Sequence, residues 1–358
     1  MIRTAVIGAA GYTGIELVRW LCAHPAFELT LASSDGEAQK RLDALYPALL
    51  GVTEKSFVPH AAVLEAAANG ELQLAFLAVP HTAAMDLAPT LLAKGATVID
   101  LSADFRLQDA ALYEQWYGVA HRAPELLKRA VYGLVELNRA ALHDAAAQRA
   151  AGTAALVANP GCYPTASALA AWPALQAGLA AEGPLVINAI SGVSGAGRKP
   201  TQTTHFCSAS DDLAAYGATT HRHTPEIAQT LSAVAERPLT VIFTPHLAPL
   251  VRGMVSTVVI PLQPGVALEE CRQAYLAACA DQPFLQLLEP GQMPHSAAVA
   301  GTNNAHIGIA FDGASNSLVA SCAIDNLGKG AAAQAVQSAN LLFGLPEDSG
   351  LKGVAAVV

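Results

Sequence analysis

Cys162 is the residue whose surroundings most strongly indicate chemistry. It lies in ANPGCYPT at 158–165, between an apolar run at 154–158 that predicts a strand and a stretch that predicts a helix. A helix N-terminus lowers the pKa of a thiol and raises the fraction of the nucleophilic thiolate. The prolines on either side would fix the backbone and pre-position the sulfur. We predict a catalytic nucleophile; the alternative is a small buried residue at a turn.

Two histidines could carry the proton that thiolate chemistry requires. They stand two residues apart in HRHTPEI at 221–227. In an extended segment His221 and His223 would face one side and Arg222 the other. Thr224 would then cap a helix beginning at Pro225. A shared metal is the rival interpretation, but no third ligand is evident nearby, so we predict proton transfer and no metal site.

A glycine-rich turn predicts a dinucleotide site. GAAGYTG at 8–14 follows a strand pattern and opens a helix, where close backbone approach and free N–H groups suit a pyrophosphate. The alternative is a plain strand-to-helix turn. The next strand ends at Ser33 and Ser34 without an acidic residue at its tip, which favours NADP(H) over NAD. Asp35, one residue further, argues the other way.

Three further segments are rich in polar donors. SGVSGAGRK at 191–199 predicts a flexible loop that could hold a phosphate or carboxylate, or an ordinary glycine-rich connection. LSADFR at 101–106 ends a strand with Arg106, which could bind a planar anion with two donors or pair with Asp104 or Asp109 at the surface. DNLGKGA at 325–331 is a polar turn, alternatively a simple helix cap.

The elements that must position these residues change type along the chain. Apolar runs alternate with helical patterns in the first half, which predicts a parallel sheet. The second half has strands with few helices between them, which predicts an α+β domain. The expected strands are 4–8, 28–32, 72–79, 96–101, 154–158, 185–190, 240–243, 254–260, 307–311 and 318–324; the expected helices include 14–23, 85–94 and 328–343.

Composition sets the class of protein. The 358 residues are 53% hydrophobic and 14% charged, which suits a large core and two domains. The net charge is −9 and no basic block stands out, so we predict no nucleic-acid partner. Residues 150–181 carry no charge, but Pro160, Pro164 and Pro173 interrupt them, so we predict a buried strand, a turn and a core helix rather than a membrane span.

Cysteine usage indicates the compartment. The six cysteines form no CxxC pair, which disfavours a zinc ribbon and suits reduced thiols in the cytoplasm. The N-terminus shows no signal peptide, so we expect a cytoplasmic protein. Five cysteines lack the setting of Cys162 and are interpreted as structural, namely Cys22, Cys207, Cys271, Cys279 and Cys322.

Taken together, these segments resemble the N-acetyl-γ-glutamyl-phosphate reductase family. More remotely, the layout is similar to that of aspartate-semialdehyde dehydrogenase. The matching segments lie in order over nearly the whole length: GAAGYTG at 8–14, LSADFR at 101–106, ANPGCYPT at 158–165, SGVSGAGRK at 191–199, HRHTPEI at 221–227, FTPHLAP at 243–249 and DNLGKGAAAQAVQ at 325–337.

The resemblance implies an architecture and a reaction. It implies an α/β protein with a Rossmann-type NADP-binding domain at 1–155 plus 325–358 and an α+β catalytic and dimerisation domain at 156–324. The expected reaction is NADPH-dependent reduction of N-acetyl-L-glutamyl 5-phosphate to the 5-semialdehyde. The reaction is expected to pass through a thioester on Cys162, with release of phosphate. The resemblance places it in arginine biosynthesis. A homo-oligomer, dimer or tetramer, is expected.

The resemblance also implies roles for individual residues. His223 is expected to carry the proton, with His221 as the alternative, and Asn326 to contact the nicotinamide amide. Arg106, Ser191 and Arg198 are candidates for the substrate's phosphate or carboxylate. The expected cofactor-binding set is Gly8, Gly11, Tyr12, Thr13, Gly14, Ser33, Ser34, Pro80, Gly192, Gly195 and Asn326.

Other functions remain open at this point. Aspartate-semialdehyde dehydrogenase or an aminoadipate-type reductase would share the chemistry, although HRHTPEI argues against the former. A non-catalytic NADP-binding regulator would not need Cys162 and His223. A cysteine hydrolase would not need the glycine-rich nucleotide turn.

Overall fold

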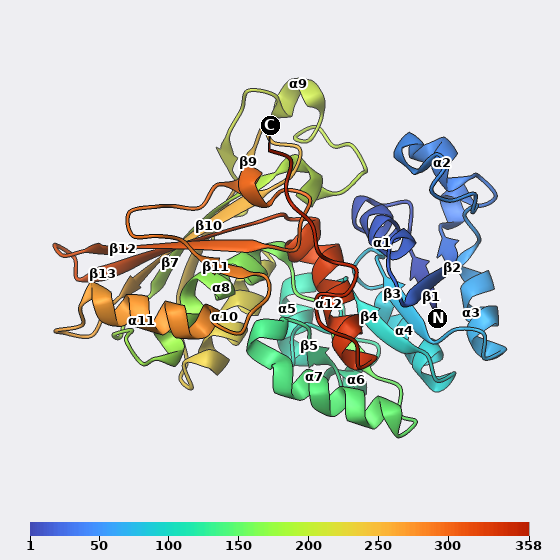
Figure 1. Cartoon of the computed structure of the whole chain (residues 1–358), viewed down its shortest axis with the longest axis horizontal. Helices are drawn as coiled ribbons and strands as arrows, with labels where there is room; N and C mark the ends of the chain where they lie inside the picture. Colours follow the sequence, from blue (N-terminus) through green and yellow to red (C-terminus); the bar gives the residue numbers. More distant parts are fainter. Residues whose placement is uncertain (358) are drawn as a thin grey trace. The chain divides into compact units, whose positions relative to one another are not determined.

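The computed structural model describes residues 1–357, which form two units, each built around one β-sheet (Figure 1). The first unit comprises Met1–Pro160 and Ala331–Lys352. The second unit comprises Gly161–Gly330 and the chain from Gly353 onward. The sequence-based division placed 156–160 in the second domain, and 325–330 and 353–358 in the first.

The sheet of the first unit is parallel, as the alternating pattern predicts. Within the described residues it has six strands in the order β2-β1-β3-β4-β6-β5, and every pair runs parallel. β3 and β4 are buried along their whole length, which explains their continuous apolar sequence. The strands are β1 (Ile2–Ile7), β2 (Phe27–Ser33), β3 (Leu74–Leu77), β4 (Thr97–Asp100), β5 (Val131–Tyr132) and β6 (Leu156–Ala158).

Helices cover this sheet and complete the first unit. The last of them, α12, begins at Ala333 and not at 328, because Gly328–Ala332 form a π-helical turn. All of α12 is buried, and it packs against α7 and α1. The helices are α1 (Tyr12–Cys22), α2 (Leu42–Leu45), α3 (His60–Ala68), α4 (Ala84–Ala93), α5 (Ala110–Tyr117), α6 (Pro124–Leu127), α7 (Val135–Ala150) and α12 (Ala333–Leu342).

The second unit carries a mixed sheet, in agreement with the predicted α+β domain. Its seven strands within the described residues have the order β11-β12-β13-β10-β7-β9-β8, with β7 and β9 parallel. The strands expected at 307–311 and 318–324 form an antiparallel hairpin, β12 and β13, with its turn after Asp312. The strands are β7 (Leu185–Gly192), β8 (Ala214–Ala215), β9 (Val241–Ala248), β10 (Met254–Pro261), β11 (Leu285–Leu287), β12 (Ala305–Asp312) and β13 (Ser317–Ile324).

One helix forms the centre of the second unit. Tyr163–Leu175 of α8 (Cys162–Gln176) are all buried, which explains the uncharged stretch of the sequence. α8 packs on β10 and β13 beside α10 (His223–Val234) and α11 (Leu268–Cys279), while α9 (Phe206–Ala209) is a short exposed helix. Among residues 1–357, none of the helices has the length and apolar character needed to cross a bilayer.

The opposite face of this mixed sheet is only half covered and carries both apolar and polar side chains, the polar ones including Thr257, Asn188 and Thr244. Along β10, Met254, Ser256 and Val258 are buried, whereas the alternate side chains of Val255 and Val259 are half-exposed. Val186 of β7 pairs with both Val259 and Ile242 of β9, so these three share that face. Ile242 is 46% exposed and Ile190 is 39% exposed. Helices therefore cover one face of this sheet, and the other face stays partly exposed in the described chain.

Candidate functional site

Cys162 is the first residue of α8. β6 ends at Ala158, Gly161 takes the N-cap position with extended backbone angles, and no side chain caps the helix. The sulfur-bearing side chain is half-buried. The predicted strand–turn–helix setting of Cys162 is therefore present, and no side chain caps the backbone N–H groups at the start of α8.

Glu226 holds the peptide that precedes Cys162. Its side chain is 1% exposed, and Oε1 accepts a hydrogen bond of 2.9 Å from the backbone N–H of Gly161. Oε2 lies 4.0 Å from Nε2 of His223, one helical turn earlier on α10. One buried carboxylate thus contacts both the cysteine turn and a histidine. Glu226 was not predicted from the sequence, although its spacing of three residues from His223 was a usable signal.

The histidine segment is not extended, and this corrects the prediction. α10 begins at His223 after Arg222, so Thr224 lies inside the helix and is not its cap. The N–H of His223 donates to Nδ1 of His221 over 3.1 Å, which turns the chain tightly. The two imidazoles still meet, with ring centroids 4.9 Å apart. They are brought together by a turn and not by strand alternation.

His221 lies in an aromatic environment that keeps it neutral. Its ring centroid is 5.5 Å from each of Tyr163, Tyr216 and Phe243. Burial, helped by the positive charge of Arg222, lowers the pKa of His221 to about 4. Nδ1 accepts the N–H of His223, so the neutral ring carries its proton on Nε2. At neutral pH His221 is therefore a fixed neutral imidazole.

Two tyrosines, also missed by the sequence analysis, continue this cluster. The hydroxyl of Tyr216 donates to the hydroxyl of Tyr163 over 3.1 Å, and that of Tyr163 donates to the carbonyl of His246 over 3.2 Å. Burial raises the pKa of Tyr216 to about 12 and that of Tyr163 further. Both are neutral phenols near Cys162 and His221 in the second unit.

The loop predicted to be flexible is partly ordered. Residues Val193–Ala196 form a 3₁₀ turn whose first N–H donates to the carbonyl of Leu250 over 2.8 Å. A Cβ built at Gly192 would lie 2.9 Å from that carbonyl oxygen, so only glycine fits. Ser191 is buried, and a Cβ at Gly195 would lie 3.2 Å from its Oγ, whereas Arg198 is exposed.

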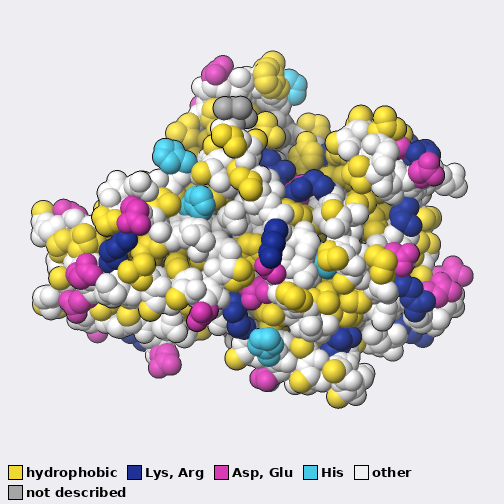
Figure 2. Space-filling view, viewed as in Figure 1, with side chains coloured by type: hydrophobic (Ala, Val, Ile, Leu, Met, Phe, Trp, Pro, Cys, Tyr) yellow, Lys and Arg dark blue, Asp and Glu magenta, His cyan; other side chains and the backbone are white. Residues whose placement is uncertain are grey.

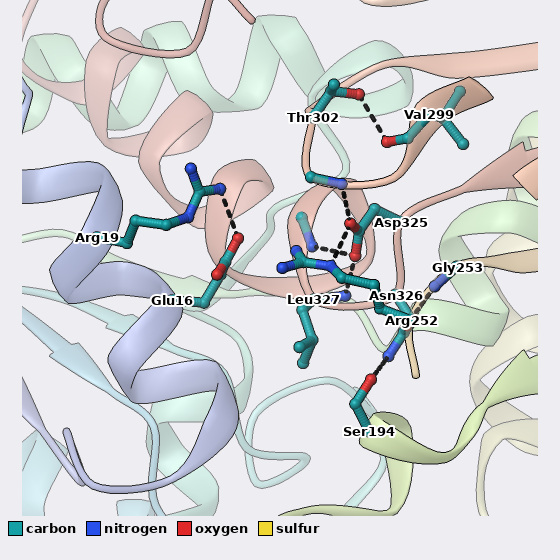
Figure 3. A network of polar contacts seen from close by, with 12 residues as sticks. Glu16, Arg19, Ser194, Arg252, Gly253, Val299, Thr302, Asp325, Asn326 and Leu327 are labelled. Carbon is teal, nitrogen blue, oxygen red and sulfur yellow. Dashed lines mark hydrogen bonds and ion pairs between the residues drawn. The ribbon is translucent and has the colours of Figure 1, made fainter. Parts of the chain in front are cut away.

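Asn326 secures this loop (Figure 3). Its Nδ2 donates to Oγ of Ser194 over 2.9 Å, and its Oδ1 accepts the N–H of Gly253 over 2.7 Å. The neighbouring Asp325 is fully buried and pairs with Nε of Arg252 over 2.7 Å. Asp325 also accepts the N–H groups of Leu327 and Gly328, as the helix-cap alternative supposed.

In the first unit the glycine-rich turn suits a pyrophosphate. Gly8 has φ +86°, and a Cβ there would lie 2.2 Å from the carbonyl oxygen of Ala78. A Cβ at Gly14 would lie 2.2 Å from the carbonyl oxygen of Gly8. α1 starts at Tyr12 after Gly11, with no side-chain cap and no acidic residue in its first turn, which includes Thr13. The backbone of this helix start can therefore receive an anion.

His60 contacts two residues at and just after the end of β2. Ser33 is fully buried and its Oγ lies 2.9 Å from Nδ1 of His60. The backbone N–H of His60 donates to Oδ1 of Asp35 over 2.8 Å. Asp35 is thus turned toward the start of α3, while Ser34 stays half-exposed. Pro80, beyond the end of β3, is exposed.

Arg106 is buried and braces two strand ends. It is 6% exposed; Nε donates to the carbonyl of Asn159 over 2.8 Å and Nη2 to that of Leu101 over 2.9 Å. Asp109 instead caps α5, and Asp104 accepts N–H groups at the start of α4. The side chain of Arg106 is therefore buried, and not at the surface where the ion-pair alternative placed it.

Asp100, at the end of β4, predicts a pH effect on stability. Burial and the nearby Asp104 carboxylate raise its pKa to about 7. Between about pH 4 and 7 the folded chain holds a proton that the unfolded chain has released, so stability falls as the pH rises through that range. Asn in place of Asp100 can still accept the N–H of Ser102 and stays neutral.

We therefore expect Asp100→Asn to raise the thermal midpoint relative to the parent protein more at about pH 8 than at about pH 5. The difference corresponds to about 2–3 kcal/mol in the free energy of unfolding. Melting both proteins across this range checks it. Parallel pH dependence of the two midpoints would contradict the raised pKa of Asp100.

On the face shown in Figure 2, acidic and basic side chains are interspersed. Among residues 1–357, no three His, Cys, Asp or Glu side chains group as metal ligands.

Comparison with known proteins covers the whole chain. Residues 3–145 match the family described as "Semialdehyde dehydrogenase, NAD binding domain", and residues 162–326 match "Semialdehyde dehydrogenase, dimerisation domain". The chain is 46% identical over 359 residues to the N-acetyl-gamma-glutamyl-phosphate reductase of Halorhodospira halophila, with 100% of both chains covered. It is 43% identical to that of Moorella thermoacetica, with 98% of both covered.

Solved structures show the same fold at low identity. Aspartate semialdehyde dehydrogenase II of Vibrio cholerae, complexed with ASA, has a TM-score of 0.71 at 16% identity, covering 96% of this chain and 98% of that one. Aspartate semialdehyde dehydrogenase with NADP from Candida albicans has a TM-score of 0.69 at 13% identity, with 96% and 98% covered.

Proposed function

Because the chain belongs to the N-acetyl-γ-glutamyl-phosphate reductase family, we propose that it reduces N-acetyl-L-glutamyl 5-phosphate to the 5-semialdehyde, with release of phosphate. NADP(H) is the cofactor, and the pathway is arginine biosynthesis. The observation that carries the proposal is Cys162 at the start of α8, with Glu226 contacting both the preceding peptide and His223. These contacts support Cys162 as the nucleophile and His223 as the proton carrier.

The first half-reaction makes a thioester. The thiolate of Cys162 attacks the acyl carbon, a C–S bond forms, the C–O bond to phosphate breaks, and phosphate leaves. The N–H groups at the start of α8 stabilise the oxyanion. Because thiolate is the reactive form, the helix N-terminus serves the nucleophile as well as the intermediate.

The second half-reaction needs hydride and a proton. Bound NADPH supplies the hydride. Cys162 holds the acyl group as the thioester, and the oxyanion formed on reduction collapses to the aldehyde with release of the sulfur. His223 moves the proton at Nε2, and Glu226 balances the positive charge on its ring. His221, neutral at pH 7, orients His223 by accepting its backbone N–H.

The residues present fit NADP(H). The uncapped start of α1 at Gly11–Gly14 would hold the pyrophosphate, with Gly8 allowing close backbone approach. Ser34 is the candidate for the 2′-phosphate, because Ser33 is buried against His60. We keep Pro80, Gly192, Gly195 and Asn326 as further cofactor candidates, and Arg106, Ser191 and Arg198 as substrate candidates.

Ser34→Asp should reverse part of the cofactor preference. A carboxylate at the strand tip repels the 2′-phosphate but can accept from a 2′-hydroxyl. We expect NADP⁺ affinity, measured by calorimetry, to fall at least about tenfold relative to NAD⁺ affinity, an energy typical of one charge contact. Ser34→Asn, which has similar size and no charge, is the matched control. An unchanged NADP⁺/NAD⁺ ratio would contradict the assignment of Ser34.

The reverse reaction tests the function directly. The protein is mixed with N-acetyl-glutamate 5-semialdehyde and NADP⁺, with and without phosphate, and NADPH is followed by absorbance. Phosphate-dependent NADPH formation is expected. Activity with aspartate semialdehyde but not with N-acetyl-glutamate 5-semialdehyde would reassign the substrate. NADP⁺ binding without turnover of either aldehyde would favour a regulator.

We further propose that the protein forms a homo-oligomer through the uncovered sheet face of the second unit, and that it works in the cytoplasm, where Cys162 stays reduced. Ile190, which pairs with Val255, and Ile242, which pairs with Val186, are exposed on this face and favour burial against a second copy. Ile242→Asp should convert the oligomer to monomer in light scattering. Leu276→Asp, at an exposed position of α11, is the control that should leave the mass unchanged.

A further inference from the structure

Asp325 lies at a junction of three chain segments of the second unit. Its side chain is fully buried directly after β13. The carboxylate accepts Nε of Arg252 over 2.7 Å, the N–H of Leu327 over 2.8 Å and that of Gly328 over 3.1 Å. It also accepts the N–H of Gly301 (Figure 3). Charge-assisted hydrogen bonds to so many donors make a rigid junction.

The segment held most closely is the π-helical turn Gly328–Ala332. The backbone carbonyl of Asp325 accepts the N–H of Gly330 over 2.8 Å, so the side chain and the main chain of one residue both fix this turn. On its other side, a Cβ at Gly328 would lie 2.2 Å from the carbonyl oxygen of Thr302. The turn therefore has little room to move away from Asp325.

The backbone of Gly330 packs directly against Cys162. A Cβ built at Gly330 would lie 2.8 Å from Cβ of Cys162 and 3.2 Å from its Cα. Bare backbone thus packs on the carbon that carries the sulfur. Any shift of this turn opens or closes space at Cβ of Cys162, and so changes where the sulfur sits relative to the N–H groups of α8.

We propose that Asp325 is a positioning residue that fixes the sulfur of Cys162 by holding the turn of Gly328 and Gly330 against it. The proposal rests on the function proposed above for Cys162, but it concerns the thiol itself. A sulfur that drifts from the helix N-terminus loses stabilisation of its thiolate. The Asp325 side chain bonds to Arg252, to Gly301 and to the turn, and we infer that it acts on the sulfur through the turn.

Loss of the Asp325 charge and loss of the sulfur's position have opposite effects on the Cys162 thiolate, so the two can be told apart. Removing the Asp325 charge leaves the Arg252 cation without this partner, and by Coulomb attraction alone that favours the Cys162 thiolate. Loss of positioning disfavours the thiolate. The test follows alkylation of Cys162 by iodoacetamide against pH in the full-length protein, with the labelled peptide identified by mass spectrometry.

For Asp325→Asn we expect the pH midpoint of alkylation to rise and the alkylation rate at pH 7 to fall about tenfold, because the thiolate fraction sets this rate. We expect kcat to fall on the order of 100-fold, as for a nucleophile displaced by about 1 Å, with KM changed less than about threefold.

Two variants complete the design. Gly330→Ala leaves Asp325 intact but pushes a methyl group against Cys162, and it should also lower the alkylation rate and kcat; it keeps the proposal testable if Asp325→Asn fails to fold. Asp312→Asn is the control, because Asp312 holds the β12–β13 turn through Ala314 and Ser315 at the far end of the same strands. It should leave alkylation unchanged.

The outcomes separate the two proposals. A folded Asp325→Asn protein with an unchanged or lowered alkylation midpoint overturns the positioning role. If the parent protein shows no reductase activity, yet alkylation of Cys162 responds to Asp325→Asn and Gly330→Ala as expected, the proposed function fails while the positioning of the thiol stands.

Discussion

Cys162→Ala is expected to abolish phosphate-dependent NADPH formation, a loss on the order of 10⁴-fold or more. Without the thiol no thioester forms, and NADPH would have to reduce the acyl phosphate directly. The residues proposed for the pyrophosphate lie elsewhere in the sequence, at Gly8–Gly14. NADP⁺ affinity measured by calorimetry should therefore stay within about twofold, far below the change expected for a lost charged contact.

Cys279→Ala is the matched control for this experiment. Cys279 is also partly buried, but burial raises the pKa of its thiol to about 11, so it is protonated at neutral pH. Its replacement should leave turnover within about twofold, because thiolate is the reactive form. Turnover that survives in Cys162→Ala would sink the thioester mechanism, and a non-catalytic regulator would show no difference between the two variants.

His223→Asn is expected to lower kcat by about 10²- to 10⁴-fold, the usual contribution of a positioned acid or base. The substitution removes Nε2, which lies 4.0 Å from Glu226, and leaves the backbone N–H that contacts His221. KM for the semialdehyde should change much less, because His223 transfers its proton in the transition state and not while the substrate is only bound. Steady-state kinetics in the reverse direction measures both.

His221→Asn separates the two histidines. An amide oxygen can replace Nδ1 as the acceptor for the N–H of His223, so we expect less than about a tenfold loss, far below the range for an acid or base. Because the pKa of His221 is about 4, the pH dependence of kcat/KM between about pH 6 and 9 should match that of the parent. Should His221→Asn lose as much activity as His223→Asn, the proton carrier would be reassigned.

The sequence predicted the elements whose patterns are local. The continuous apolar runs of β3 and β4 indicate strands buried on both faces, and these are the centre of the parallel sheet. The two-residue strand Val131–Tyr132 has no usable pattern and was not predicted. The π-helical turn at Gly328–Ala332 escaped for another reason: it is held by Asp325, whose partners Arg252 and Gly301 are remote in sequence.

In the candidate site too, features set by local sequence could be predicted and features set by remote contacts could not. Cys162 could be found because its strand, turn and helix are consecutive in the chain. The arrangement of His221 and His223 could not, because the extended and helical alternatives differ only through the turn that precedes α10. Glu226, Tyr163 and Tyr216 act through contacts between separate elements, and such contacts leave no periodicity in a single sequence.

The way the chain returns to its first unit bears on how the protein is made. The first unit lacks α12 until residues Ala333–Leu342 have been synthesised, yet Asn340 of that helix contacts His24 and its face packs on α1 and α7. The second unit is nearly continuous from Gly161 to Gly330. On the ribosome, therefore, the second unit can be complete before the first, whose six strands have all emerged by Ala158 but whose α12 emerges only with the last part of the chain.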